Sequence, residues 1–262
     1  MKAYKGFNEN MTCRDFQYEE GKSYEMEDAK LCDHGFHACA YPLDCLNYYA
    51  PASSVYHEVE QENVTSEKQE DTKQVSSKIK IGARLDVAGL VKASVEYVKE
   101  RADKPNSATG DRSANSATGN WSANSATGNW SANSATGDRS ANSATGYRSA
   151  NSATGDWSAN SATGNRSANS ATGYGSANIS TGIECENSSG QKDIISVGWG
   201  KDNKCRGVAG SYLVLVERGE WDGEKYPMLG EPILVKVDGE KIKENVWYML
   251  KNGTITEVDG ND

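Results

Sequence analysis

The chain has 262 residues, a formal net charge of −9 and a hydrophobic content of 36%. Globular domains usually contain about 45–50% apolar residues, so this composition argues against one large hydrophobic core. An acidic chain repels phosphate backbones, and we expect no general nucleic-acid binding. No stretch resembles a signal peptide or approaches the roughly 18 apolar residues of a membrane span. We therefore expect a soluble cytoplasmic protein without a membrane partner, whose six cysteines are reduced.

The N-terminal part predicts a small α+β head over residues 1–60. Short β-like runs cover residues 3–7, 16–18 and 54–59, and residues 42–49 have helical spacing with Pro42 in the first turn. Residues 61–77 are charged and nearly free of apolar side chains, which predicts a linker. Residues 78–105 then predict a strand at 78–81 and a capping helix that begins after Asp86 and ends by Lys104, before Pro105.

A nine-residue repeat dominates the middle of the chain, with the consensus S-A-N-S-A-T-G-x-x. Glycine recurs at positions 110, 119, 128, 137, 146, 155, 164, 173 and 182. This period excludes collagen, in which glycine is every third residue, and an α-helix would need an apolar stripe at a 3.6-residue period. Disorder is the alternative that composition permits, but strict register and flanking caps favour a β-solenoid over residues 106–210.

The repeat also predicts how one coil is built. Identical residues should stack at the strand spacing of about 4.8 Å, and glycine should form the corner with a positive φ. Alanine and hydroxyl side chains leave only a thin interior, which favours two repeats in an 18-residue coil. Three repeats in a 27-residue coil is the alternative, because it would place Arg112, Arg139 and Arg166 in one row.

The C-terminal residues 211–262 predict an antiparallel β cap. Strand-like runs cover residues 211–217, 232–237, 246–250 and 254–258, and Asp238-Gly239 and Asn252-Gly253 are hairpin turn pairs. The fold class is therefore mainly β: a solenoid with a small α+β head and an antiparallel cap. The narrow solenoid leaves a homo-oligomer open as a way to bury more surface.

The variable pair of each repeat lies at a turn, so its side chains should project from an edge of the solenoid. These side chains either shield the corners or form a multivalent strip for sugars, nucleotides or a protein surface. Ice binding by the recurring threonines, beginning with Thr109, Thr118 and Thr127, is a further alternative. The candidate binding residues are Arg112, Trp121, Trp130, Arg139, Arg148, Trp157 and Arg166.

Two resemblances include the repeat array, and only the second extends to the whole chain. The repeat resembles the S-x-A-x-G head repeats of trimeric autotransporter adhesins, which form left-handed β-rolls. The whole chain is similar to a family of uncharacterised bacteriophage and prophage proteins through residues 4–7, 35–39, 48–49 and 247–253. This second resemblance implies a phage origin, the host cytoplasm as location and no known activity.

The head is also distantly similar to ADP-ribosyltransferase folds. The resemblance rests on the order of residues 4–6, 35–38 and 48–49, although Lys5 replaces the expected His or Arg and His37 replaces Tyr. It implies an enzyme that binds NAD, with Tyr4, His37 and Glu58 as its site.

A Cys/His cluster in the head raises the possibility of a metal site. Cys32, His34, His37 and Cys39 are closely spaced, but they match no standard zinc motif, and we expect buried structural cysteines instead.

We expect a non-enzymatic binding or scaffolding protein without a cofactor, whose Arg/Trp edge contacts a host protein, a phage protein or a small ligand. An ADP-ribosyltransferase-like head on a solenoid spacer is the alternative. Ice or carbohydrate binding by the repeat face is a minor one.

Overall fold

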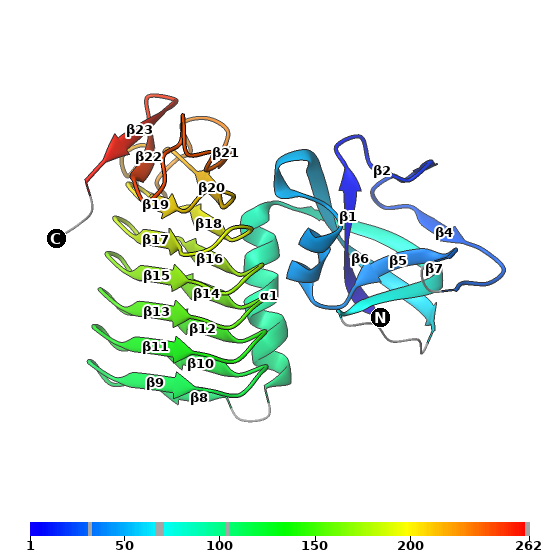
Figure 1. Ribbon diagram of the computed structural model, residues 1–262, viewed down its shortest axis with the longest axis horizontal. Helices are drawn as coiled ribbons and strands as arrows, with labels where there is room; N and C mark the ends of the chain where they lie inside the picture. The colour runs from blue at the N-terminus through cyan, green and yellow to red at the C-terminus, as the bar shows by residue number, and fades with distance from the viewer. Residues whose placement is uncertain (31–32, 66–70, 103–104, 260–262) are drawn as a thin grey trace. The chain divides into compact units, whose positions relative to one another are not determined.

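The computed structural model describes residues 1–30, 33–65, 71–102 and 105–259 (Figure 1). The chain forms two compact units, Met1–Ser94 and Val95–Asp262. The expected fold class is confirmed: a β-solenoid follows a small head and ends in antiparallel strands. Among the helices of the described residues, none is long and apolar enough to cross a membrane.

The head is built on one antiparallel sheet in the order β4-β7-β5-β1-β6, and β7 also pairs with β6. Because β7 joins both sides, the sheet closes on itself around a core that includes Phe7, Phe36 and Ile79. The sheet strands are β1 (Lys2–Asn8), β4 (Ser23–Glu25), β5 (Phe36–Cys39), β6 (Ser54–Val64) and β7 (Lys73–Leu85). The other elements are β2 (Thr12–Cys13), β3 (Phe16–Gln17) and the 3-10 helices η1 (Pro42–Asn47) and η2 (Pro51–Ser53).

The predicted linker at 61–77 is wrong, because β6 and β7 occupy most of it. Opposite charges face each other across these paired strands, since Glu62 of β6 pairs with Lys78 of β7 at 3.0 Å. Val75 points into the core and is fully buried. The expected head boundary at residue 60 is therefore too early, and residues 66–70 lie outside the described residues.

A helix is confirmed at the predicted position as α1 (Val87–Arg101). Its start is fixed by Asp86, whose Oδ1 accepts a hydrogen bond from the Gly89 backbone N–H at 2.6 Å. The helix ends at Arg101, before the predicted limit at Lys104, which lies outside the described residues. From Val95 onward the helix belongs to the unit of the solenoid, where the Tyr97 ring centroid lies 6.0 Å from that of Trp121.

Each solenoid coil contains two repeats, so residues 18 apart pair in parallel register and the 27-residue alternative is wrong. The coils stack into two sheets (Figure 1). The first sheet contains β8 (Asn106–Ala108), β10 (Ala123–Ala126), β12 (Ala141–Ala144), β14 (Ala159–Ala162), β16 (Ala177–Ser180), β18 (Ile195–Gly198) and β20 (Tyr212–Leu215). The second contains β9 (Ala114–Ala117), β11 (Ala132–Ala135), β13 (Ala150–Ala153), β15 (Ala168–Ala171), β17 (Glu186–Ser189) and β19 (Lys204–Gly207).

Buried asparagines join the two sheets through the thin interior. The Asn142 side-chain amide donates to the Asn160 Oδ1 at 3.0 Å and to the Ser152 carbonyl at 2.7 Å. The same pair of bonds recurs at Asn124 and Asn151. Because each amide satisfies both the next coil and the opposite sheet, the strict repeat is explained by polar satisfaction of the interior.

The prediction that glycine supplies a positive φ is wrong. The positive φ lies at the ninth repeat position instead, with values between 53° and 59° from Arg112 to Arg166. The repeat glycine is required by close stacking, because a Cβ on Gly146 would overlap the carbonyl oxygen of Gly128 in the previous coil. Glycine therefore permits backbone contact between coils, whereas the turn itself holds larger residues.

The C-terminal cap starts later than residue 211, because β20 still pairs in parallel with β18. The antiparallel strands that follow are β21 (Ile233–Lys236), β22 (Trp247–Lys251) and β23 (Thr254–Val258). The hairpin turn at Asn252-Gly253 is confirmed, since β22 and β23 pair directly. The predicted Asp238-Gly239 hairpin is wrong, because β21 extends the first sheet and β22 the second.

Candidate functional site

The candidate binding residues all lie at solenoid turns, but they divide between two edges instead of forming one strip. Because residues 18 apart stack, alternate repeats reach opposite edges. We call Arg112, Trp130, Arg148 and Arg166 the exposed edge, because all four are exposed. We call Trp121, Arg139 and Trp157 the opposite edge, because all three are only partly exposed.

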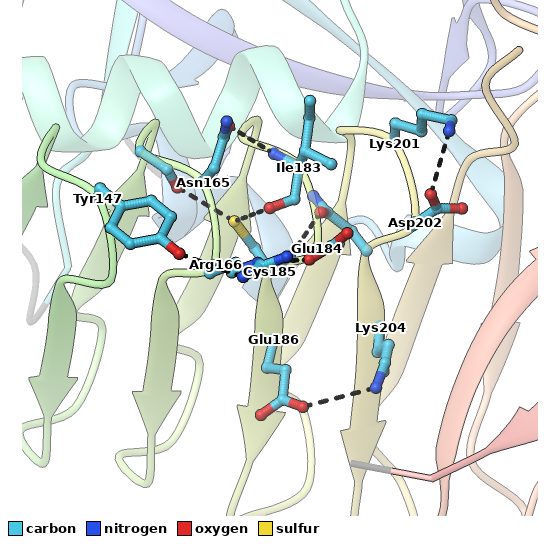
Figure 2. Close-up of polar contacts among 12 residues, drawn as sticks. Tyr147, Asn165, Arg166, Ile183, Glu184, Cys185, Glu186, Lys201, Asp202 and Lys204 are labelled. Atoms are coloured by element: carbon cyan, nitrogen blue, oxygen red, sulfur yellow. Dashed lines mark hydrogen bonds and ion pairs between the residues drawn. The ribbon is translucent and has the colours of Figure 1, made fainter. Parts of the chain in front are cut away.

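The exposed edge is a continuous row of cationic and aromatic side chains. The Arg148 guanidinium lies 4.9 Å from the Trp130 ring centroid. Figure 2 shows the next coils, where Arg166 donates to the Tyr147 hydroxyl at 3.2 Å and pairs with Glu184 at 2.6 Å. The hydrogen bond to Glu184 raises the pKa of Arg166. Trp130 is 52% exposed although a ring of this size is usually well covered, so this edge presents a large aromatic surface to solvent.

The opposite edge packs its side chains more closely. Arg139 lies 5.4 Å from the Trp121 ring centroid, and the Trp157 ring lies 5.3 Å from that of Tyr174. Trp121 also contacts Tyr97 of α1. These contacts within the unit favour the corner-shielding role for this edge.

The two faces of the solenoid also differ. In each A-N-S-A strand from β10 to β15 the second Ala is buried, and the Thr that follows the strand is exposed on both sheets, as at Thr127 and Thr136. Ala132, Ala150 and Ala168 of the second sheet are exposed, whereas their counterparts on the first sheet, Ala123, Ala141 and Ala159, are buried. We call the second sheet the open sheet because its alanines at these positions are exposed. A groove of about 530 Å³ follows it and ends at Glu186, Arg206 and Trp247.

The residues of the enzyme hypothesis do not all meet. Tyr4 and His37 line a cavity of the head, whereas Glu58 is not among the lining residues that the structure describes. The Glu58 carboxylate instead pairs with Lys2 at 2.8 Å.

The residues of the candidate metal cluster have separate surroundings. His34 lies 3.0 Å from Asp28 at the surface, and Cys39 is buried near Cys45. Cys32 lies outside the described residues, and the remaining described part of the chain holds no group of three or more metal-binding side chains. The described cysteines, at positions 13, 39, 45, 185 and 205, are free thiols.

The sequence alone did not identify two residues that belong to the exposed edge. Tyr147 occupies the eighth position of its repeat and bridges the row between Trp130 and Arg166. Glu184 lies 18 residues beyond Arg166 and extends the row into the degenerate coils. The 18-residue period is the signal that would have revealed both.

Residues 1–93 match the family model described as Domain of unknown function (DUF7666). The match therefore covers the head and stops at the boundary of the first compact unit. No curated protein and no solved structure matches the chain.

Proposed function

We propose that this protein is a non-enzymatic binding protein whose exposed edge contacts an acidic segment of a protein partner. The observation that carries the proposal is the row of three arginines and a half-exposed tryptophan on one edge of a chain with a net charge of −9. Neighbouring coils are about 4.8 Å apart, so the row spans several residues of an extended peptide. A bacteriophage origin and the host cytoplasm belong to the same proposal.

The turn geometry supports this role because it fixes where each side chain begins. Trp130 and Arg148 have φ values of 59° and 53°, a region that large side chains rarely adopt. Backbone hydrogen bonds to the next coil hold each turn, as between Trp130 N–H and the Tyr147 carbonyl at 2.8 Å. A partner thus meets a preorganised row, which reduces the entropy cost of binding.

An octaglutamate peptide tests the proposal by NMR of the six indole N–H groups of the full chain. The Trp130→Asn variant identifies the Trp130 signal, and asparagine tolerates the positive φ. We expect this signal to shift on titration, and we expect Trp130→Asn with Arg148→Asn to weaken binding, measured by calorimetry, about tenfold or more. Added salt should weaken it further.

The opposite edge supplies the matched control, because Trp121→Asn with Arg139→Asn changes the same residue types. Binding should persist in this variant. An unshifted Trp130 signal, or equal weakening by the two double variants, would contradict the proposal. Tighter binding of an oligonucleotide than of the acidic peptide would also contradict it.

A second candidate function is carbohydrate binding in the groove of the open sheet. The observation that favours it is Trp247 at the end of rows of Ser and Ala, because aromatic rings stack on sugar faces. Trp247 is held by Arg206, whose guanidinium lies 4.5 Å from the ring centroid. A glycan array tests this candidate function. We expect Trp247→Ala to lose glycan binding and the control variant Trp221→Ala to keep it. Equal glycan binding by both variants would contradict it.

A further inference from the structure

The head contains a cavity of about 340 Å³ whose charge is opposite to that of the chain. Its lining includes Lys5, Arg14 and Lys73, and none of the described lining residues is an aspartate or glutamate. The remaining lining is aromatic and thiol-bearing, with Tyr48, Tyr49 and three cysteines. The volume is within the usual range for a small-molecule site.

Lys5 is the most informative of these cations because it is only 4% exposed. Its ammonium group lies near aromatic rings, with Nζ 5.1 Å from the Phe7 centroid and 5.6 Å from the Tyr18 centroid. Nζ donates to the His37 carbonyl at 3.0 Å and contacts Cys13 Sγ at 3.5 Å. The described residues include no carboxylate paired with it. Burying a cation without a counter-ion is costly, so an anion from outside the chain would complete the site.

Among the residues that the structure describes, neither of the other two cations forms an ion pair, although Asp71 accepts hydrogen bonds from the Lys73 backbone N–H and the Tyr48 hydroxyl. Arg14 donates to the backbone carbonyl of Asp33 at 3.3 Å, and Lys73 Nζ lies 4.5 Å from the Tyr48 ring centroid. Burial first, and then Lys5, lowers the pKa of His37 to about 4, with smaller effects from Lys73 and Arg14. All three positive charges therefore favour the neutral form of the His37 imidazole in this cavity.

One wall of the cavity depends on a glycine. A Cβ on Gly6 would lie 2.6 Å from the Tyr49 ring, so only glycine lets this ring pack against β1. Tyr49 then donates from its hydroxyl to Cys13 Sγ at 2.9 Å. The Tyr49 ring and the three cations thus line the same cavity.

We propose that this cavity binds a small phosphate monoester with an attached ring. Three cations match the double negative charge of such a phosphate better than the single charge of a carboxylate, and Tyr48 and Tyr49 provide aromatic surface for the ring. This site is separate from the solenoid edge, and neither proposal depends on the other.

Phenyl phosphate and benzoate are matched probes, because they share the ring and differ in the anionic group. Calorimetry on the full chain should show phenyl phosphate binding at least about tenfold more tightly than benzoate. Arg14→Gln and Lys73→Gln should each weaken it about tenfold, since each removes a charged hydrogen-bond donor. Lys80→Gln is the control, because Lys80 lies on the same strand as Lys73 but outside the lining.

A second measurement follows Cys13, which is partly exposed. Its alkylation by iodoacetamide, read by peptide mass spectrometry, should slow when phenyl phosphate is bound. Lys5→Met should abolish binding while a normal melting curve confirms folding; if that variant does not fold, the Arg14 and Lys73 variants decide. The proposal is overturned if phenyl phosphate does not bind at millimolar concentration, if benzoate binds equally, or if Lys80→Gln weakens binding as much as Lys73→Gln.

Discussion

The repeat array and the head differ in what determines the surroundings of each residue. In the array a residue meets copies of itself 18 positions away, as Asn142 does between Asn124 and Asn160. In the head the contacts are irregular: Lys5 of β1 contacts Cys13 of β2 and His37 of β5. A substitution in the array should therefore depend on its depth in the stack, whereas one in the head should depend on its particular neighbours.

Changing an inner glycine of the array should have the largest effect. The new Cβ of Gly146→Ala would overlap the backbone of Gly128, which cannot move without separating two coils. We expect a loss of about 4 kcal/mol or more in the free energy of unfolding, measured by urea denaturation. Gly119→Ala is the control, because the nearest atom to its Cβ is the Ser122 hydroxyl at 3.5 Å, and a change within about 1 kcal/mol is expected. Equal losses would show that depth in the stack does not matter.

Removing an inner asparagine should have the next largest effect. Asn142→Ala takes the hydrogen bonds from Asn160 Oδ1 and the Ser152 carbonyl and leaves buried groups unsatisfied. This should cost about 2–3 kcal/mol in urea denaturation. Asn106→Ala in the first coil should cost about 1 kcal/mol or less, because its bonds are partly exposed. A cost as large for Asn106 as for Asn142 would contradict the ladder argument.

The same contrast explains what could be predicted from the sequence. The repeat period, the thin interior and the pairing of two repeats per coil follow from residues that recur, because a repeated side chain has to satisfy its own copy. The single-edge prediction is wrong because two repeats per coil make residues 18 apart neighbours. Arg112 and Trp121 are nine residues apart, so they lie at opposite edges. The role of glycine was misjudged because a corner and a close backbone contact both select glycine.

The head offered no such internal rule. Its linker prediction failed because the charged residues around Glu62 and Lys78 pair across strands, which composition does not show. The cation cluster of Lys5, Arg14 and Lys73 joins residues of widely separated segments through the closed sheet. Nothing in their spacing indicates that they meet.

Acid should separate the two regions in stability. The three histidines at positions 34, 37 and 57 all lie in the head. The pKa of His37 falls from 6.5 in the unfolded chain to about 4 in the folded head, so stability is complete above pH 6.5 and is lost as the pH falls toward 4. Because the ring is partly exposed, we expect a loss of about 1–2 kcal/mol across this window.

Hydrogen exchange at pH 7 and pH 5 measures this difference by region. Opening of the head should become easier at pH 5, while the inner coils of the array should change little. The His37→Gln variant should remove most of the dependence in the head. A dependence that survives this substitution, or that appears equally in the array, would assign the effect to other groups.

The smallest effects should lie at the turn residues, the only array positions that the repeat leaves free to vary. Trp130 and Trp121 share a φ of 59°, and each lies near an arginine of the next coil, but Trp121 also contacts Tyr97 of α1 and is less exposed. Asparagine relieves the backbone strain equally at both positions, so the difference between Trp130→Asn and Trp121→Asn measures the side-chain contacts alone. We expect a change within about 0.5 kcal/mol for Trp130 and a loss of about 1 kcal/mol for Trp121 in urea denaturation. If both variants are equally stable, the contacts of the opposite edge contribute nothing measurable, and corner shielding would no longer explain why tryptophan occupies that edge.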